Sequence, residues 1–302
     1  MNGFINILKP PGMTSHDVVA WCRRLFRQRK IGHAGTLDPG VAGVLPVALG
    51  QGTRLLEYFL DSDKSYRCEI VLGLETTTQD LEGEIVARHP VSRDQLERFP
   101  QLLQECVGEQ LQVPPMVSAV RWQGKRLYEL AREGKEVARP PRRVRISDIT
   151  LVDVQFEQPP YRALFDVTCS KGTYIRTLCH DLGRKLGCGA SLSFLVRTRT
   201  GPFRLEEAKT LEEIQSAWVQ GETDFLLPLN GVLPFPKERI GEDLVMALRQ
   251  GKRIPCEALA TQTVFCPNQL VQLEDADGLV AVAQVVQDRQ RLFLQPRKVI
   301  KG

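Results

Sequence analysis

The sequence of 302 residues lacks the motifs of common metal, redox and nucleotide sites. Its eight cysteines include no Cys-x-x-Cys pair and no Cys/His cluster with metal-ligand spacing. It has no dinucleotide fingerprint and no Gly-Lys-Ser/Thr phosphate loop, and its four histidines, His16, His33, His89 and His180, form no obvious metal set. We therefore expect neither a metal nor an organic cofactor, and most cysteines should be reduced, buried apolar residues.

Long apolar runs and a secretory leader are also missing. No stretch approaches eighteen uninterrupted apolar residues, and the first residues, MNGFINILKPPG, contain no basic region followed by an apolar one. Neither a membrane-spanning nor a secreted protein is indicated, so we expect a cytoplasmic protein. A chain of this length can form one large domain, or a large domain and a small one.

A strong excess of one charge is missing as well, because the formal net charge is only +4. The distribution of charge is nevertheless uneven. Residues 121–145 hold nine Lys and Arg against three Glu, and a second run without acids consists of Arg23, Arg24, Arg27, Arg29 and Lys30. One such run alone is ordinarily a solvated helix face. Two runs on either side of a glycine-rich loop favour a nucleic-acid track.

The glycine-rich loop is the most informative stretch that is present. Residues 32–50 read GHAGTLDPGVAGVLPVALG, so five glycines bracket one His and one Asp. Glycine permits positive φ, and Pro39 biases Asp38 toward an extended conformation. The apolar residues from Gly43 to Gly50 predict a buried strand that anchors the loop at one end. The pattern therefore predicts a tight loop that presents the Asp38 carboxylate.

Three interpretations of this loop compete. A phosphate cradle is disfavoured, because the loop has no Gly-Lys-Ser/Thr and Asp38 would repel the anion. A turn that only joins two elements is common for such a composition. The third interpretation is a catalytic carboxylate, and the ordered string favours it. GHAGTLDPxxxGxLPxxxG closely resembles the signature of the tRNA pseudouridine-55 synthase (TruB) family, in which the Asp of this loop is the essential catalytic residue.

Two further motifs resemble those of the same family. Asp63-Lys-Ser-Tyr-Arg is similar to its second motif, whose Tyr stacks on the target base, so the resemblance assigns that role to Tyr66. Without it, a Tyr in an amphipathic strand is ordinarily a core residue. Gly172-Thr-Tyr-Ile-Arg176 is similar to the third motif, whose Arg pairs with the catalytic carboxylate. Such a guanidinium would keep the carboxylate ionised and hold it in one orientation, whereas the alternative is a surface Arg.

The resemblance also gives expected roles to four further residues, some of which lie within these motifs. Leu195 corresponds to an apolar residue that packs on the uracil, although it is also a plain core candidate. Lys9 resembles the Lys of an N-terminal Lys-Pro that supports the active-site loop, and a surface lysine is the alternative. His33 could act as a base or as a wedge in the space that a flipped nucleotide leaves, and the resemblance favours the wedge. Tyr174 lies within the third motif and is expected to bind substrate.

The basic segment is also expected to contact RNA. Few apolar residues accompany its charge, so little hydrophobic burial is available to hold it, and we expect a segment that closes on RNA. Residues 116–139 resemble the RNA-gripping thumb of the family, and Arg121, Lys125 and Arg126 are the expected contacts. A strand at Val117–Trp122, a turn at Gln123-Gly124 and a helix at Lys125–Glu133 are predicted there.

Periodicity predicts several other elements. Thr14 or Ser15 caps a helix that runs to about Arg27 and places Val18, Val19, Cys22, Leu25 and Phe26 on one face. A strand is expected at Lys64–Leu74, with Tyr66, Cys68, Ile70 and Leu72 on one face. Ser92 and Gln95 predict a capping box that opens two short helices ending near Pro114.

The fold class implied is α+β: a mixed, largely antiparallel central sheet flanked by helices, followed by a small β-rich, PUA-like C-terminal domain. We expect the catalytic domain at residues 1–230, its basic RNA-gripping insertion at about 112–145, and the C-terminal domain at 235–302. The resemblance covers roughly residues 3–200. It departs from the family at Arg54, where a Lys is frequent, and at Ala42, where a Thr is common. Neither departure changes charge or size greatly.

The resemblance implies isomerisation of uridine 55 in the T-stem-loop of tRNA, a reaction that needs no external electron or group donor. A monomer without membrane contact or an obligate protein partner is expected. Two other classes remain open: a guide-RNA-dependent pseudouridine synthase subunit, and an RNA-folding chaperone that uses the same basic surfaces. The residues also leave open whether Asp38 forms a covalent adduct or abstracts a ribose proton.

Overall fold

The computed structural model describes residues 1–118, 120–259 and 261–300, and the chain divides into two compact units. The first unit comprises Met1–Gly40, Val44–Leu60 and Pro202–Gly302, and the second comprises Val41–Gly43 and Asp61–Gly201. Each unit therefore draws on stretches that are distant in sequence. None of the helices in the described part of the chain is long and apolar enough to cross a membrane.

The second unit is built on a sheet with the strand order β12-β4-β11-β10-β7, in which neighbours are antiparallel. Two small hairpins, β5-β6 and β8-β9, accompany it. In chain order the elements are β4 (Lys64–Leu72), β5 (Leu74–Thr76), β6 (Ile85–Arg88), α3 (Arg93–Gln104), β7 (Gly108–Gln112), β8 (Arg121–Trp122), β9 (Lys125–Arg126), α4 (Leu127–Arg132), β10 (Arg142–Gln155), β11 (Arg162–Cys169), α5 (Ile175–Leu186) and β12 (Ala190–Thr200).

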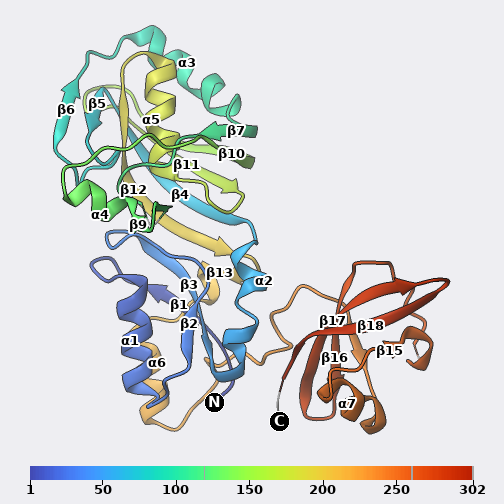
Figure 1. Ribbon diagram of the computed structural model, residues 1–302. Coiled ribbons are helices and arrows are strands. Elements are labelled where there is room, and N and C mark those ends of the chain that lie inside the picture. Colours follow the sequence, from blue (N-terminus) through green and yellow to red (C-terminus); the bar gives the residue numbers. More distant parts are fainter. Residues whose placement is uncertain (119, 260, 301–302) are drawn as a thin grey trace. The chain divides into compact units, whose positions relative to one another are not determined.

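Helices α3 and α5 cover one face of this sheet, as Figure 1 shows. The strands place alternate residues on that face, and Cys68, Ile70 and Leu72 of β4 are buried there, with Tyr66 packed against the same cluster. The predicted face of this strand is thus confirmed. Helix α5 contributes apolar side chains at helical spacing and ends at Gly187, whose φ of +84° closes the helix in the left-handed conformation.

The first unit begins with the strands and helices that frame the glycine-rich loop. Strands β1 and β2 both pair with β3. Helix α1 begins after Thr14, whose side chain accepts a hydrogen bond from the Asp17 amide in a full capping box, and the predicted apolar face packs in one cluster. The elements are β1 (Gly3–Lys9), α1 (Ser15–Leu25), β2 (Ile31–His33), β3 (Ala42–Leu49, whose first two residues belong to the second unit), a 3₁₀ turn (Gly50–Arg54), α2 (Glu57–Leu60), β13 (Phe203–Arg204), a 3₁₀ turn (Leu205–Glu207) and α6 (Leu211–Val219).

A separate sheet forms the C-terminal part of this unit, with the strand order β14-β16-β17-β18-β15. It is the red sheet of Figure 1. Its elements are β14 (Lys237–Arg239), α7 (Glu242–Arg249), β15 (Ile254–Pro255), a 3₁₀ turn (Cys256–Ala258), β16 (Leu270–Asp275), β17 (Gly278–Asp288) and β18 (Arg291–Val299). The expected β-rich C-terminal region is therefore present, and the predicted fold class is confirmed.

Several local predictions need correction. The strand predicted at Val117–Trp122 is confined to Arg121–Trp122 among the described residues, and the helix predicted at Lys125–Glu133 begins only at Leu127, because Lys125 and Arg126 form β9. Only one helix, α3, follows the Ser92 capping box, because the chain turns at Gly108 (φ +114°) and residues 108–112 pair with β10 as a strand. The strand at Lys64 ends at Leu72, where Gly73 (φ +80°) turns the chain into β5. Helix α6 was not predicted, although the Thr210–Glu213 capping box that opens it follows a readable pattern.

One of the tight backbone approaches in the second unit involves Gly43. Its φ is +124°, and a Cβ at this position would lie 2.3 Å from the Arg197 carbonyl oxygen. Gly43 pairs with Arg197, and Ala42 with Val196, where β3 runs parallel to β12. This parallel contact makes the sheet mixed, and only glycine allows it.

We expect Gly43→Ala to lower the free energy of unfolding by about 3 kcal/mol, because the added methyl group must displace backbone. Gly108→Ala is the matched control. It has a similar positive φ of +114° but no atom within 4 Å of the added Cβ, and should cost only about 1 kcal/mol. Urea unfolding of the two variants separates steric exclusion from backbone strain. Equal losses would contradict the packing argument.

Candidate active site

The Asp38 carboxylate is exposed on a loop whose two flanking residues are both fixed. On one side, the Leu37 amide donates to Ser15 Oγ at 2.9 Å. On the other, the Pro39 carbonyl oxygen accepts from the Gly12 amide at 2.9 Å and from Lys9 Nζ at 3.1 Å. The loop thus presents an accessible carboxylate on an immobilised backbone, which is the arrangement that a catalytic group requires.

Lys9 is one of the most deeply buried side chains of the protein. Its ammonium group donates to three carbonyl oxygens, those of Pro10 at 2.9 Å, Met13 at 2.6 Å and Pro39 at 3.1 Å. These bonds match the three donors of an ammonium group and offset its desolvation. Lys9 therefore links the end of β1 to the following turn and to the Asp38 loop through hydrogen bonds. The alternative that it is a surface lysine is excluded.

His33 lies at the end of β2, on the same stretch as the Asp38 loop. Its Nε2 lies 3.3 Å from His16 Nδ1, on α1, and the ring centroids are 5.4 Å apart. One imidazole must donate and the other accept in this contact. His33 is thus oriented by a second ring, a partner that the sequence did not indicate.

In the second unit, Tyr66 and Leu195 share one face of the sheet. Leu195 of β12 is the register partner of Cys68, two residues along β4 from Tyr66. Both Tyr66 and Leu195 are half-buried and pack on the edge of the same apolar cluster. One phenol ring and one aliphatic side chain therefore lie near each other at the border of the core, where a planar base could contact both.

Two buried cations flank Tyr66. Arg197 is its register partner on β12, is 1% exposed, and its guanidinium donates a hydrogen bond to the Tyr66 hydroxyl. Lys64 precedes Tyr66 by two residues on the same face, and its ammonium group donates to the Ser62 carbonyl oxygen. Burial, together with the charge of Arg197, lowers the pKa of Lys64 to about 8.

Arg176 lies at the start of α5, where a side chain is often exposed. The alternative that it is a surface residue is nevertheless wrong. It is buried, and its guanidinium donates to the carbonyl oxygens of Thr78 at 3.1 Å and Val117 at 2.9 Å. Its Nε also lies 3.6 Å from Asp80 Oδ2, in an ion pair whose side chains are 5% and 18% exposed. The structure therefore holds this cation in one orientation from several sides.

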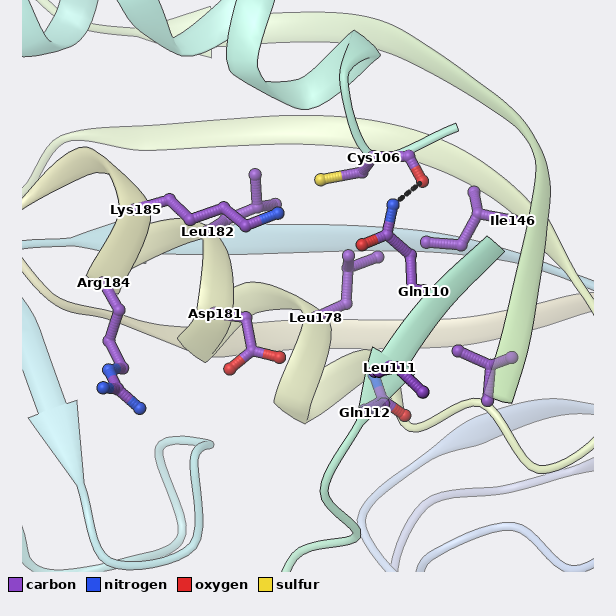
Figure 2. A pocket seen from close by; sticks show the side chains of 11 residues that line it. Cys106, Gln110, Leu111, Gln112, Ile146, Leu178, Asp181, Leu182, Arg184 and Lys185 are labelled. Carbon is purple, nitrogen blue, oxygen red and sulfur yellow. Dashed lines mark hydrogen bonds between the residues drawn. The ribbon is translucent and has the colours of Figure 1, made fainter. Parts of the chain in front are cut away.

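Tyr174 is positioned by a side chain that the sequence did not indicate. Gln112, buried at the end of β7, accepts a hydrogen bond from the Tyr174 amide at 2.7 Å and donates to its carbonyl oxygen at 2.9 Å. This two-point contact joins the start of the basic segment to the residue before α5. Figure 2 shows Gln112 at a cleft of about 410 Å³, which is lined mainly by α5, β7 and β10. Among the described residues, no predicted site residue lines this cleft, so we assign no substrate to it.

The basic residues Arg121, Lys125 and Arg126 lie on the β8-β9 hairpin. Its turn, Gln123 and Gly124, has positive φ at both positions, as the twist of a two-residue hairpin requires. Lys125 pairs with Glu133 at 2.8 Å, and Lys135 pairs with the same carboxylate. These hydrogen bonds lower the pKa of Glu133 to about 2. The hairpin thus displays exposed cations, with Arg126 partly covered, at the tip of the segment that leaves β7.

The predicted site residues are divided between the units. Lys9, His33 and Asp38 belong to the first, and the remaining seven, Tyr66, Arg121, Lys125, Arg126, Tyr174, Arg176 and Leu195, belong to the second. The pairing of Arg176 with Asp38 therefore stays a prediction. Sequence reasoning missed Ser15, Asp80, Gln112 and Arg197, which orient site residues. Of these, only Arg197 had a signal in the sequence, because it lies two residues after the predicted site residue Leu195.

Comparison with known proteins identifies similar chains over the full length. A family model described as TruB family pseudouridylate synthase (N terminal domain) matches residues 23–175, and one described as tRNA pseudouridylate synthase B C-terminal domain matches residues 176–233. The tRNA pseudouridine synthase B of Moorella thermoacetica is 49% identical over 99% of both chains. That of Symbiobacterium thermophilum is 58% identical over 71% of both chains.

Two solved structures have a similar fold. A chain in the crystal structure of a Cbf5-Nop10-Gar1 complex is 30% identical, with a TM-score of 0.75 over 98% of this chain and 84% of the other. A chain in an H/ACA RNP bound to a substrate RNA containing 2'-deoxyuridine is 28% identical, with a TM-score of 0.74 over 99% of this chain and 85% of the other.

We expect Lys9→Met to lower the free energy of unfolding by about 2–4 kcal/mol, because three carbonyl oxygens lose their donor. Hydrogen exchange at residues 37–40 should also become faster than in the unmodified protein. Lys30→Met, which removes an exposed lysine, is the control and should change neither quantity. If Lys9→Met changes neither the free energy of unfolding nor the hydrogen exchange, the hydrogen bonds of Lys9 do not stabilise the Asp38 loop.

Proposed function

This chain belongs to the TruB family of pseudouridylate synthases, and from that premise we propose that it isomerises uridine 55 in the T-stem-loop of tRNA to pseudouridine. As an RNA pseudouridine synthase it catalyses an isomerisation in which the glycosidic bond to N1 breaks and C5 of the same uracil is joined to the ribose. The observation that supports its site most directly is Asp38, an exposed carboxylate of the family motif on a loop fixed on both sides.

Asp38 starts the reaction, as a nucleophile or as a base that takes a ribose proton. Either role requires an ionised carboxylate at a fixed position near the sugar. Arg176 supplies the countercharge. Its own orientation is maintained by Asp80 and by the Thr78 and Val117 carbonyl oxygens, so the guanidinium needs no reorientation within its own unit when substrate arrives.

The target base must leave the RNA stack to reach Asp38. Tyr66 and Leu195 provide an aromatic and an aliphatic contact at the border of the core, and a flipped uracil stacks there. Tyr174 adds an aromatic side chain beside Arg176. His33, oriented by His16, is the wedge that fills the space left in the RNA.

The RNA backbone is held by Arg121, Lys125 and Arg126. Two of these cations are exposed on the hairpin, and the segment that carries them begins at Gln112, which is tied to Tyr174. Neutralisation of phosphates by such residues releases counterions and gives sequence-independent affinity. The hairpin therefore holds the RNA backbone, whereas Tyr66 and Leu195, which contact the base, select the nucleotide.

The protein acts as a monomer in the cytoplasm, without an obligate protein partner or a guide RNA. Structures of similar fold include chains from Cbf5 and H/ACA complexes, but these are only 28–30% identical. The relatives at 49% and 58% identity are both named tRNA pseudouridine synthase B. The guided-subunit alternative is therefore less well supported than independent action on tRNA.

We expect Asp38→Asn to abolish pseudouridine formation in an unmodified tRNA transcript, because an amide can neither attack the sugar nor take its proton. Binding of the transcript should stay within about threefold of the unmodified protein, since one neutral isostere changes little contact surface. Pseudouridine is mapped by carbodiimide adducts and primer-extension stops, with no metal, cofactor or guide RNA added.

Asp224→Asn, which removes an exposed carboxylate of the same unit, is the control. Its primer-extension stop at position 55 should be as strong as that of the unmodified protein. Normal activity of Asp38→Asn would exclude this Asp as the catalytic residue. An unmodified protein that binds the transcript without producing a stop would exclude independent synthase activity. RNA refolding by Asp38→Asn, measured in parallel, reports any chaperone activity.

We expect the triple change Arg121→Gln, Lys125→Gln and Arg126→Gln to weaken tRNA binding about ten- to hundredfold. The slope of log affinity against log salt should become shallower by about 2 to 3, because each lost phosphate contact removes about one released ion. The rate at saturating tRNA should be nearly unchanged. A double change of Arg93→Gln and Arg98→Gln on α3 is the control for loss of exposed charge. An unchanged salt slope in the triple variant would show that the hairpin does not hold RNA.

A further inference from the structure

Arg197 is an arginine with almost no solvent contact. It is 1% exposed and is the largest of the fully buried side chains in the described part of the chain. Burying a guanidinium is unfavourable unless it is hydrogen-bonded, and burial accordingly lowers the pKa of Arg197. A residue of this kind is retained where its charge or its donors perform a task.

The guanidinium of Arg197 contacts Tyr66. The two residues are register partners on the adjacent strands β12 and β4, so their side chains lie side by side on one face. The guanidinium donates a hydrogen bond to the Tyr66 hydroxyl oxygen. That oxygen therefore acts as acceptor toward Arg197, and its own proton is directed away from the guanidinium.

The backbone of Arg197 is fixed as firmly as its side chain. It pairs with Gly43 at the start of β3, where no side chain larger than hydrogen fits between the two backbones. Leu195, two residues before it, occupies the same face, and Leu195 and Tyr66 both pack against the same apolar cluster. The position of the guanidinium relative to the phenol is thus set by strand register and close packing.

Lys64 adds a second positive charge to the same surroundings. It lies two residues before Tyr66 on β4, is 6% exposed, and its charge interacts unfavourably with that of Arg197. Two buried cations destabilise each other, so their proximity is unfavourable for stability. Their joint field favours negative charge on the Tyr66 oxygen.

We propose that Arg197 is a positioning residue for Tyr66: its guanidinium fixes the orientation of the phenol ring and stabilises the phenol oxygen while its proton moves. The inference rests on the proposed function, because it assigns Arg197 a role in the same reaction. Arg197 touches neither the sugar nor the uracil in this account, and acts only through the Tyr66 hydroxyl.

The reaction gives this arrangement a defined task. Isomerisation replaces the N1–C1′ bond by a C5–C1′ bond, so the C5–H bond must break and N1 must gain a proton. Tyr66 gives its hydroxyl proton to the N1 side of the detached uracil and takes one from C5 after the new bond forms. The electrons of the C5–H bond restore the C5–C6 double bond, and Tyr66 ends as a neutral phenol. The guanidinium stabilises the phenolate between these steps.

The test compares Arg197→Met with Arg67→Met in single-turnover pseudouridine formation on a tRNA transcript. Arg67 is the residue next to Tyr66 and lies on the opposite face in an exposed ion pair with Asp166, so its loss removes a cation without touching the phenol. We expect Arg197→Met to lower the rate constant about 100-fold and to leave the dissociation constant for tRNA within threefold. Arg67→Met should leave both near the values of the unmodified protein.

A double variant separates this role from a merely structural one. If Arg197 acts through the hydroxyl, Arg197→Met in a Tyr66→Phe background should reduce the rate by less than threefold, because the acceptor is already absent. If the two single changes lower the rate by factors that multiply in the double variant, the inference is overturned. It is also overturned if Arg197→Met reacts as fast as Arg67→Met. Arg197→Lys keeps a donor in the cavity if the Met variant fails to fold. Its rate should lie between those of the unmodified protein and Tyr66→Phe, and a rate equal to that of the unmodified protein would also overturn the inference.

The outcomes also separate this inference from the proposed function. If the unmodified protein forms pseudouridine and Asp38→Asn does not, the proposed function holds, and the Arg197 variants alone decide the positioning role. If the unmodified protein forms none, both are overturned together.

Discussion

The fixed backbone on either side of Asp38 is the constraint on which the site depends. An exposed carboxylate on a glycine-rich loop would ordinarily sample many positions, and a catalytic group displaced by about 1 Å can lose about two orders of magnitude in rate. Here Ser15 holds the Leu37 amide, and Lys9 with Gly12 holds the Pro39 carbonyl oxygen. Glycine provides the turn, and hydrogen bonds from the preceding strand, turn and helix remove the freedom that glycine brings.

Buried cations are a second feature that the predicted site residues of both units share. Among the described residues, the buried Lys and Arg side chains are Lys9, Lys64, Arg176 and Arg197. Each lies in or next to a stretch that resembles a family motif. The four are matched by different acceptors: carbonyl oxygens for Lys9 and Lys64, carbonyl oxygens and a carboxylate for Arg176, and a phenol for Arg197. Because burial of charge is unfavourable without such partners, these four residues are better explained by a role in chemistry than by a gain in stability.

Prediction from the sequence was most successful where a pattern is local. The α1 capping box, the face of β4 that carries Cys68, and the β-rich C-terminal region were all readable from short windows. It failed where contacts with a segment distant in sequence decide the secondary structure. Residues 108–112 became a strand because β10 offers hydrogen-bond partners, and the extent of α6 depends on the cluster formed with β1 and α1.

By itself, the sequence determined which chemical groups are available and in what order. An Asp in a glycine-rich loop, a Tyr on an alternating strand and an Arg at a helix start specify a family, because such ordered strings are rare by chance. Only the tertiary structure decided which of these groups are buried and what each one contacts. Lys9 meets Pro39, Gln112 meets Tyr174 and Arg197 meets Tyr66 through strand register and close backbone packing. These are long-range properties, and no periodicity within a short window of residues encodes them.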